Sequence, residues 1–137
     1  MFFKKKNTKA TSYLVKIGAL LIHAAKIDEN FTVEEEEVIK KTLLDLGGPN
    51  IDLNSIIIKA KENEEQSNQI LDFTREIKKM NDNEKIKIVE TLWRIIYSNK
   101  NADIYETNLM RRLSGLLYID SKIMGDIKEK IKKENLR

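Results

Sequence analysis

The chain has 137 residues, of which 41% are hydrophobic and 34% are charged, so one compact domain with a single core and a charged surface fits its length and composition. Its 25 basic and 22 acidic residues nearly balance, which does not favour the clustered basic face of a nucleic-acid-binding protein, and we expect no nucleic-acid partner. The chain has no cysteine, which excludes disulfides, thiolate zinc sites and cysteine nucleophiles, and one proline with five glycines provides too few turns for a many-stranded β fold.

The first eleven residues are predicted to be a flexible basic tail that precedes a helical domain at 12–137. The apolar run of Met1, Phe2 and Phe3 is too short for a signal peptide and has its lysines on the wrong side. No stretch approaches the ~20 apolar residues of a membrane span. We therefore expect a cytoplasmic protein. The alternative is a weak contact of this tail with anionic lipid at the inner face of the membrane.

Apolar residues recur at three- and four-residue steps along most of the rest of the chain, which is the pattern of amphipathic helices. Thr32 precedes one such segment, and Gly47, Gly48 and Pro49 stop it, because glycine accepts a left-handed cap and proline cannot continue a helix. We expect helices at about 12–27, 33–46, from 53, 68–80, 82–96, 104–117 and from 121 onward. About seven short helices with short connections predict an all-α compact bundle.

Two of the predicted helix starts carry further signals. Asn81 with Glu84 three residues later matches a capping box, in which two side chains satisfy free amide groups at a helix start. Asp52 precedes the third helix. That helix contains Ile56-Ile57-Ile58, a β-branched run that favours a strand, but its Lys/Glu/Gln-rich flanks and the lack of a partner strand favour a helix.

The chain also contains an internal repeat, which places residues 14–47 against 82–118. When Asp28 is set against Asn99, Leu21 meets Leu92 and Glu35 meets Glu106 without a gap. Charge and apolarity agree along both copies although few positions are identical. The repeat predicts two helical hairpins related by a pseudo-two-fold axis, with their turns at related positions.

Both predicted turns are rich in oxygen-bearing side chains. Asp28 and Glu35 belong to the first turn, and Asn99, Asp103 and Glu106 to the second. Carboxylate and amide oxygens are ligands for hard cations such as Ca²⁺ or Mg²⁺, so these five residues are the candidate metal ligands, and we expect no other cofactor. The spacing is not that of an EF-hand, since bulky residues occupy the slot where that loop needs glycine.

Helix capping is the competing interpretation of the same residues. Thr32 with Glu35, and Asp103 with Glu106, both match capping boxes, which stabilise helix starts by ~1 kcal/mol without any metal. The run Glu34–Glu37 likewise suits the positive end of a helix dipole. Capping therefore remains open beside metal binding for both turns.

Several segments in order resemble the TerB-like family, a helical domain named for a tellurite-resistance protein. The resemblance extends from about Leu14 to Ile131 and rests on residues 24–28, 72–77, 90–97 and 105–113. It implies an all-α fold, an acidic cluster that holds a divalent cation at the two turns, and a cytoplasmic protein tied to tellurite or other stress responses.

The chain departs from the family pattern of an aspartate followed by glycine in each turn. Glu29 stands in the first glycine position, and Asn99 and Lys100 replace the aspartate and glycine of the second turn. Loss of a carboxylate and gain of an ammonium group weaken the attraction for a dication. We therefore expect a degenerate site, with Asp28, Glu35 and Glu106 as its best remaining ligands.

Nothing in the sequence points to a catalytic site. His23 is the only histidine, so zinc sites with several histidines are excluded, and a catalytic triad would depend on one imidazole placed on the polar side of its helix. Trp93 falls in an apolar stripe and is expected in the core. The sequence thus predicts a non-catalytic module that binds a protein partner. A true divalent-cation sensor and a membrane-surface adaptor are the alternatives.

Overall fold

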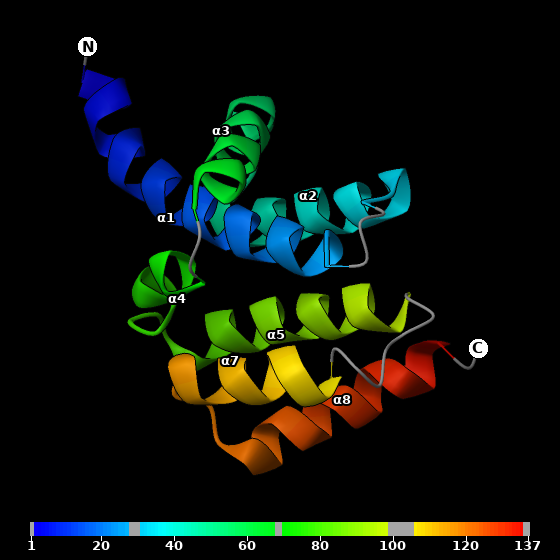
Figure 1. Ribbon diagram of the computed structural model, residues 1–137. Helices are drawn as coiled ribbons and strands as arrows, with labels where there is room; N and C mark the ends of the chain where they lie inside the picture. Colours follow the sequence, from blue (N-terminus) through cyan, green and yellow to red (C-terminus); the bar gives the residue numbers. More distant parts are fainter. Residues whose placement is uncertain (1, 28–30, 68–69, 99–105, 136–137) are drawn as a thin grey trace.

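The computed structural model describes residues 2–27, 31–67, 70–98 and 106–135, with the backbone alone at residues 2–11, 106–107 and 135. Within these ranges the chain forms seven α-helices, one π-helix and no strand (Figure 1), which confirms the predicted all-α fold. The helices are α1 (Phe2–Ala25), α2 (Val33–Gly47), α3 (Leu53–Gln66), α4 (Leu71–Ile77), α5 (Asp82–Tyr97), η1 (Glu106–Met110), α7 (Arg111–Leu116) and α8 (Ser121–Asn135).

Helix α1 is the central element, because it contacts α2, α3, α4 and α5. Its residues from Leu14 to Ala25 are nearly all buried, with Lys16 and His23 partly exposed. Gly18 permits a close approach to α3, since a Cβ atom added there would lie 2.9 Å from the Cβ of Ala60. A larger residue at position 18 would force the two helices apart.

The start of α1 differs from the prediction. We expected a tail through residue 11 and a helix from about Ser12, but α1 begins at Phe2. A backbone hydrogen-bond ladder can continue into a polar, lysine-rich segment because lysine is a good helix former. The flexibility predicted for this segment is a separate property and stays a prediction.

The ends of α2 and the start of α3 follow the sequence signals. Gly48 adopts a positive φ of 86° and its N–H donates to the carbonyl of Leu44 at 2.8 Å, which closes α2 as predicted. The Asp52 carboxylate accepts from the N–H of Ser55 at 3.2 Å and caps α3. In α3, Ile56 and Ile57 are buried while Ile58 is exposed, so the β-branched run lies on a helix.

Helix α4 is shorter than the predicted 68–80. It begins at Leu71, which is 41% exposed, and ends at Ile77, where a turn leads into α5. Phe73 and Ile77 are at most 2% exposed, and their four-residue spacing agrees with the apolar pattern. Helix α5 begins directly after Asn81, whose side-chain oxygen accepts from the N–H of Glu84 at 2.9 Å, as the capping pattern predicts.

The sixth predicted helix is divided into two kinds of helix. Its described part begins as the π-helix η1 and continues as α7, a change that the apolar periodicity did not predict. After α7, Tyr118 adopts a left-handed backbone conformation (φ 56°), and α8 follows. Met124, Ile127 and Ile131 of α8 are buried, with the three- and four-residue spacing of an amphipathic helix, and α8 packs on α5.

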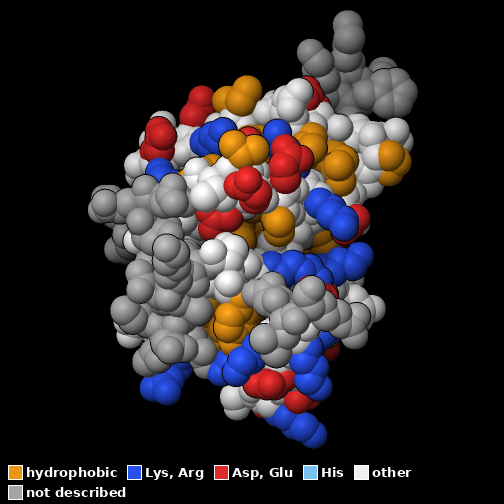
Figure 2. All heavy atoms as spheres, turned by 90° about the vertical axis from the view of Figure 1, so that its right-hand side faces the viewer, with side chains coloured by type: hydrophobic (Ala, Val, Ile, Leu, Met, Phe, Trp, Pro, Cys, Tyr) orange, Lys and Arg blue, Asp and Glu red, His pale blue; other side chains and the backbone are white. Residues whose placement is uncertain are grey.

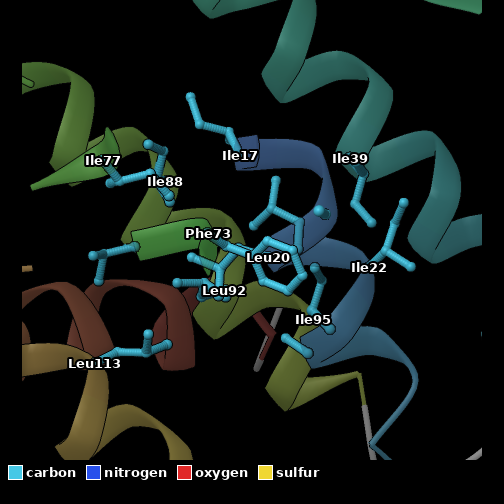
Figure 3. Close-up of a cluster of buried hydrophobic side chains, with 14 of the residues drawn as sticks. Ile17, Leu20, Ile22, Ile39, Phe73, Ile77, Ile88, Leu92, Ile95 and Leu113 are labelled. Atoms are coloured by element: carbon cyan, nitrogen blue, oxygen red, sulfur yellow. The ribbon is translucent and has the colours of Figure 1, made fainter. Parts of the chain in front are cut away.

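The core lies where the two helical hairpins meet. Leu20 of α1, Phe73 of α4 and Leu92 of α5 lie close together at its centre (Figure 3), and all three are at most 2% exposed. Helices α1 and α5 end, and α2 and η1 begin, at the same end of the molecule (Figure 1). The pseudo-two-fold symmetry itself stays a prediction.

Candidate functional site

The start of α2 forms a complete capping box. The Glu35 Oε1 atom accepts from the backbone N–H of Thr32 at 2.9 Å and from its hydroxyl at 3.1 Å, and the Thr32 hydroxyl accepts from the N–H of Glu35 at 3.1 Å. Glu35 is only 5% exposed. A buried carboxylate needs such partners, because an unpaired one is expensive to remove from water. The capping interpretation of the first turn is therefore confirmed.

Glu35 also links the two hairpins. Its second oxygen, Oε2, lies 3.4 Å from the hydroxyl of Ser98, which directly follows α5 and is 63 residues away in the sequence. The Ser98 hydroxyl lies closer to the carbonyl of Ile95, at 2.6 Å, and its single proton favours that acceptor. The bond to Glu35 is consequently weak, but the contact places the start of α2 beside the end of α5.

Of the five candidate metal ligands, Glu35 is the one whose side chain the structure describes. Asp28, Asn99 and Asp103 lie outside the described residues, and for Glu106 the backbone is described as the first residue of η1. Among the described residues, no group of three or more His, Cys, Asp or Glu side chains could hold a metal ion. The predicted site at the turns therefore stays a prediction, with Glu35 as its one placed member.

The acidic run at the start of α2 is partly paired with lysines. Glu36 Oε1 lies 2.6 Å from Lys61 Nζ of α3, and its other oxygen lies 3.6 Å from Lys40. The hydrogen bond from Lys61 lowers the pKa of Glu36, and the positive charges of both lysines add to this against an opposing effect of burial. Figure 2 views this end of the molecule, with acidic side chains gathered in its upper half, where α2 begins.

A pair of buried threonines joins α2 to α5. The hydroxyls of Thr42 and Thr91 lie 2.6 Å apart, and each also lies within 3.1 Å of the carbonyl four residues earlier in its own helix. Two hydroxyl protons cannot serve three hydrogen bonds, so one carbonyl must give up its bond while the pair forms. The sequence gave no signal for this pairing, because the two threonines lie 49 residues apart.

The threonine pair lies beside a pocket of about 460 Å³ between α2, α5 and α8. Ion pairs surround it, including Lys130 with Glu90 at 2.6 Å and Arg94 with Glu134 at 3.1 Å. Lysine and arginine side chains alternate with carboxylates along its walls. A pocket whose charges are matched internally has no strong preference for an anion or a cation.

A second pocket, of about 300 Å³, lies between α5, the start of α7, and α8, and Trp93 is one of its walls. Trp93 is 3% exposed, so the prediction of a core position is confirmed, but core packing alone does not describe its surroundings. The sequence gave no signal for this pocket. The apolar stripe predicts only that Trp93 faces inward. Whether its neighbours leave a pocket depends on how three separate helices pack.

His23 lies on the surface side of α1, as the sequence indicated. Its Nδ1 atom is 3.6 Å from Glu64 of α3, whose other oxygen lies 2.6 Å from Lys26, and the imidazole is 39% exposed. These contacts form a charged link between α1 and α3. His23 is therefore a surface residue that contributes to the packing of α1 on α3.

Within the described part of the chain, no helix combines the length and apolar character needed to cross a lipid bilayer.

Comparison with known proteins points to one family. The family model described as "Tellurite resistance protein TerB" matches residues 15–129, which is most of the chain and close to the range of the sequence resemblance. Among curated proteins and solved structures, none matches this chain.

Proposed function

Because this chain belongs to the TerB family of tellurite-resistance proteins, we propose that it is a non-catalytic interaction module of a stress response, with a degenerate divalent-cation site at its two turns. The position of Glu35 carries the proposal. This candidate ligand is buried, and three protein donors surround its two oxygens. Its carboxylate stabilises the start of α2 whether or not a cation is present.

The residues of the turns support the same conclusion. Asn99 lacks the negative charge of an aspartate, and Lys100 adds a positive one next to it. At short range, each such charge changes the energy of a dication by several kcal/mol at an effective dielectric constant of about 20. A site that has lost one carboxylate and gained one ammonium group is therefore poorly suited to Ca²⁺ or Mg²⁺.

A divalent-cation sensor is the second candidate, and one contact favours it. Glu35 lies between the start of α2 and Ser98 at the end of α5, so a cation held by Glu35 would act on both hairpins. A ligand changes a conformational equilibrium only through different affinities for the two states. Sensing therefore requires measurable cation binding by the parent protein.

Isothermal titration with Ca²⁺, Mg²⁺ and Mn²⁺ separates the two candidates. We expect no binding heat from the parent protein and recovery of binding in the double variant Asn99→Asp/Lys100→Gly, which restores the family pattern in the second turn. Adding Asp28→Asn and Glu106→Gln to that variant should remove the recovered binding, and this set leaves the Glu35 cap intact. As a charge-matched control, Glu37→Gln/Glu129→Gln in the restored variant removes two carboxylates on exposed residues and should leave binding unchanged.

Two results would decide against the degenerate site. Binding by the parent protein that is lost on Asp28→Asn/Glu106→Gln would establish the sensor. If neither the parent nor the restored variant binds a cation, the turns are not a cation site in this chain. The stress-response part of the proposal is tested by deleting the gene, which should lower the tellurite concentration that the host tolerates.

Contact with a membrane surface is the remaining alternative. Helix α1 begins at Phe2, so two phenylalanines and three lysines occupy its first turns. Basic residues near anionic lipid each contribute ~1 kcal/mol of binding. Removal of residues 2–9 should then reduce binding to vesicles with anionic lipid at low salt, and unchanged binding would dismiss this alternative. We place the protein in the cytoplasm in either case.

A further inference from the structure

The pocket beside Trp93 lies outside the two turns, and its properties are independent of the function proposed for them. Its apolar walls come from three elements: Trp93 of α5, Met110 at the end of η1, and Met124 of α8. All three side chains are at most 6% exposed. The volume of about 300 Å³ is at the lower end of the range for small-molecule sites.

The Trp93 side chain carries an unpaired polar group. Its ring stacks on Tyr97 with 5.8 Å between centroids, yet among the described residues no acceptor lies within hydrogen-bond distance of the buried indole N–H. A buried donor without an acceptor costs ~1–3 kcal/mol, and native proteins contain few of them. This N–H group belongs to a side chain that forms one wall of the pocket, so its environment should change when the pocket is filled.

The charged residues of the pocket are both cationic. Arg111 begins α7, and the Nζ atom of Lys128 lies 6.0 Å from the centroid of the Trp93 ring. Arg111 forms no salt bridge with any residue that the structure describes. No acidic side chain belongs to the described lining, in contrast to the pocket near Thr42. Arg111 therefore gives the pocket by Trp93 a preference for an anion.

The backbone around Arg111 has an unusual form. Met110 is the last residue of the π-helix and Arg111 the first of α7, so both line the pocket at the junction of two helix types. A π-helical turn has hydrogen bonds between residues five apart in place of the α-helical four, and such turns occur frequently at functional sites. Here the change of helix type sets the directions in which these two side chains leave the backbone.

We propose that this pocket binds a small organic monocarboxylate, with its apolar part against Trp93, Met110 and Met124 and its carboxylate paired with Arg111. A guanidinium group binds a carboxylate through two parallel hydrogen bonds, which a simple point charge does not match. The apolar walls select a ligand with a hydrocarbon or aromatic body over inorganic anions.

The single tryptophan makes the pocket directly observable. Trp93 is the only tryptophan of the chain, so a ¹H–¹⁵N spectrum contains one indole N–H signal. Titration with benzoate and with hexanoate should shift this signal saturably. Benzyl alcohol and hexanol, which keep the apolar body without the charge, should bind about tenfold more weakly or worse, since a hydrogen bond to a charged group contributes at least that much. Inorganic phosphate should give no saturable shift.

Two glycines provide a matched pair of variants. Gly125 in α8 lines the pocket and Gly115 in α7 does not, and a Cβ atom added at either position meets nothing within 4 Å. A Cβ atom therefore fits at both positions. Gly125→Leu fills the pocket and should abolish the carboxylate-induced shift, whereas Gly115→Leu should leave the affinity within twofold of the parent value, which is about 0.4 kcal/mol. Arg111→Gln keeps the pocket open and should weaken carboxylate binding about tenfold or more.

Three outcomes would overturn the proposal. The first is the absence of a saturable shift with either carboxylate at millimolar concentration. The second is equal binding of acids and alcohols, which would remove the role of Arg111. The third is an unchanged titration in Gly125→Leu, which would place the bound molecule elsewhere. Circular dichroism of each variant establishes that the fold is kept, so a lost shift reports on the pocket.

Discussion

The surroundings of α1 and the surroundings of Trp93 differ in how closely the helices fit. Around α1, Gly18 brings α1 and α3 together so tightly that an added Cβ atom would lie 2.9 Å from Ala60. Around Trp93, α5, α7 and α8 leave a pocket, and an added Cβ atom at Gly125 meets nothing within 4 Å. Both regions contain deeply buried side chains, so burial alone does not distinguish them.

The difference follows from the residue types at the contacts. Small residues allow two backbones to approach, and the aliphatic side chains beside them interlock at high density. A large indole with methionines around it fits less regularly, since methionine fills irregular space with a flexible chain. The tightly packed region specifies the fold, and the loosely packed region has room for a ligand.

The largest expected effect compares two leucines that the repeat aligns. Leu21 of α1 and Leu92 of α5 are both fully buried. Replacement of either by alanine should lower the free energy of unfolding by ~2–5 kcal/mol, because both side chains lie in the core, where close packing limits collapse into the cavity. Urea denaturation measures both. A loss well below ~2 kcal/mol for either variant would contradict close packing there.

The glycines give the most direct comparison, because replacement by alanine should lower the stability of the protein at one position and raise it at the other. Gly18→Ala places a methyl group against the Cβ of Ala60 and should destabilise the protein by about 2 kcal/mol. Gly125→Ala adds a methyl group in open space and should stabilise α8 by up to ~1 kcal/mol, because alanine is the better helix former. Thermal and urea unfolding of the two variants measure this. Effects of the same sign would refute the comparison.

The N-terminal caps of α2 and α5 give a third comparison. Thr32→Ala removes the hydroxyl that accepts from the N–H of Glu35 and donates to its buried carboxylate, and we expect a loss of about 1.5 kcal/mol. Asn81→Ala removes one exposed bond to the N–H of Glu84, with an expected loss of about 0.5–1 kcal/mol. Equal losses in denaturation experiments would mean that Glu35 gains nothing from the Thr32 hydroxyl.

The smallest effect concerns Glu36 and depends on pH. The pKa of Glu36 is lowered in the folded protein from its usual value of 4.5, mainly by the hydrogen bond from Lys61. The ionised group therefore adds stability above that usual value, and the contribution disappears as the pH falls through the lower pKa of the folded state. Glu36→Gln should cost no more than ~1 kcal/mol at neutral pH and nothing in strong acid.

Stability measured from pH 7 to pH 2 checks this, with Glu37→Gln as the control. Glu37 lies in the same run but its side chain is 66% exposed, and its contact with Lys40 is 3.8 Å. A difference between parent and Glu36→Gln that persists at the acid end would assign the effect to packing. High salt should reduce the neutral-pH difference, since the pair is near the surface.

Local hydrogen bonding explains why most helix boundaries could be predicted. Thr32, Asp52 and Asn81 each bind an amide three residues ahead, so the signal and its partner lie within one helical turn. Gly48 ends α2 through its own backbone conformation. The extents of α4 and α1, and the π-helix at Glu106–Met110, were missed. In these segments the propensity of the residues is compatible with more than one helix length or type.

By itself, then, the sequence determined the all-α class, the helix starts and the apolar faces, because each depends on residues a few positions apart. The tertiary structure alone decided which distant residues meet. The contact of Glu35 with Ser98, the pairing of Thr42 with Thr91 and the pocket beside Trp93 all join separate helices. Their geometry depends on how side chains of different sizes set the spacing and angle of whole helices, which periodicity along one chain does not encode.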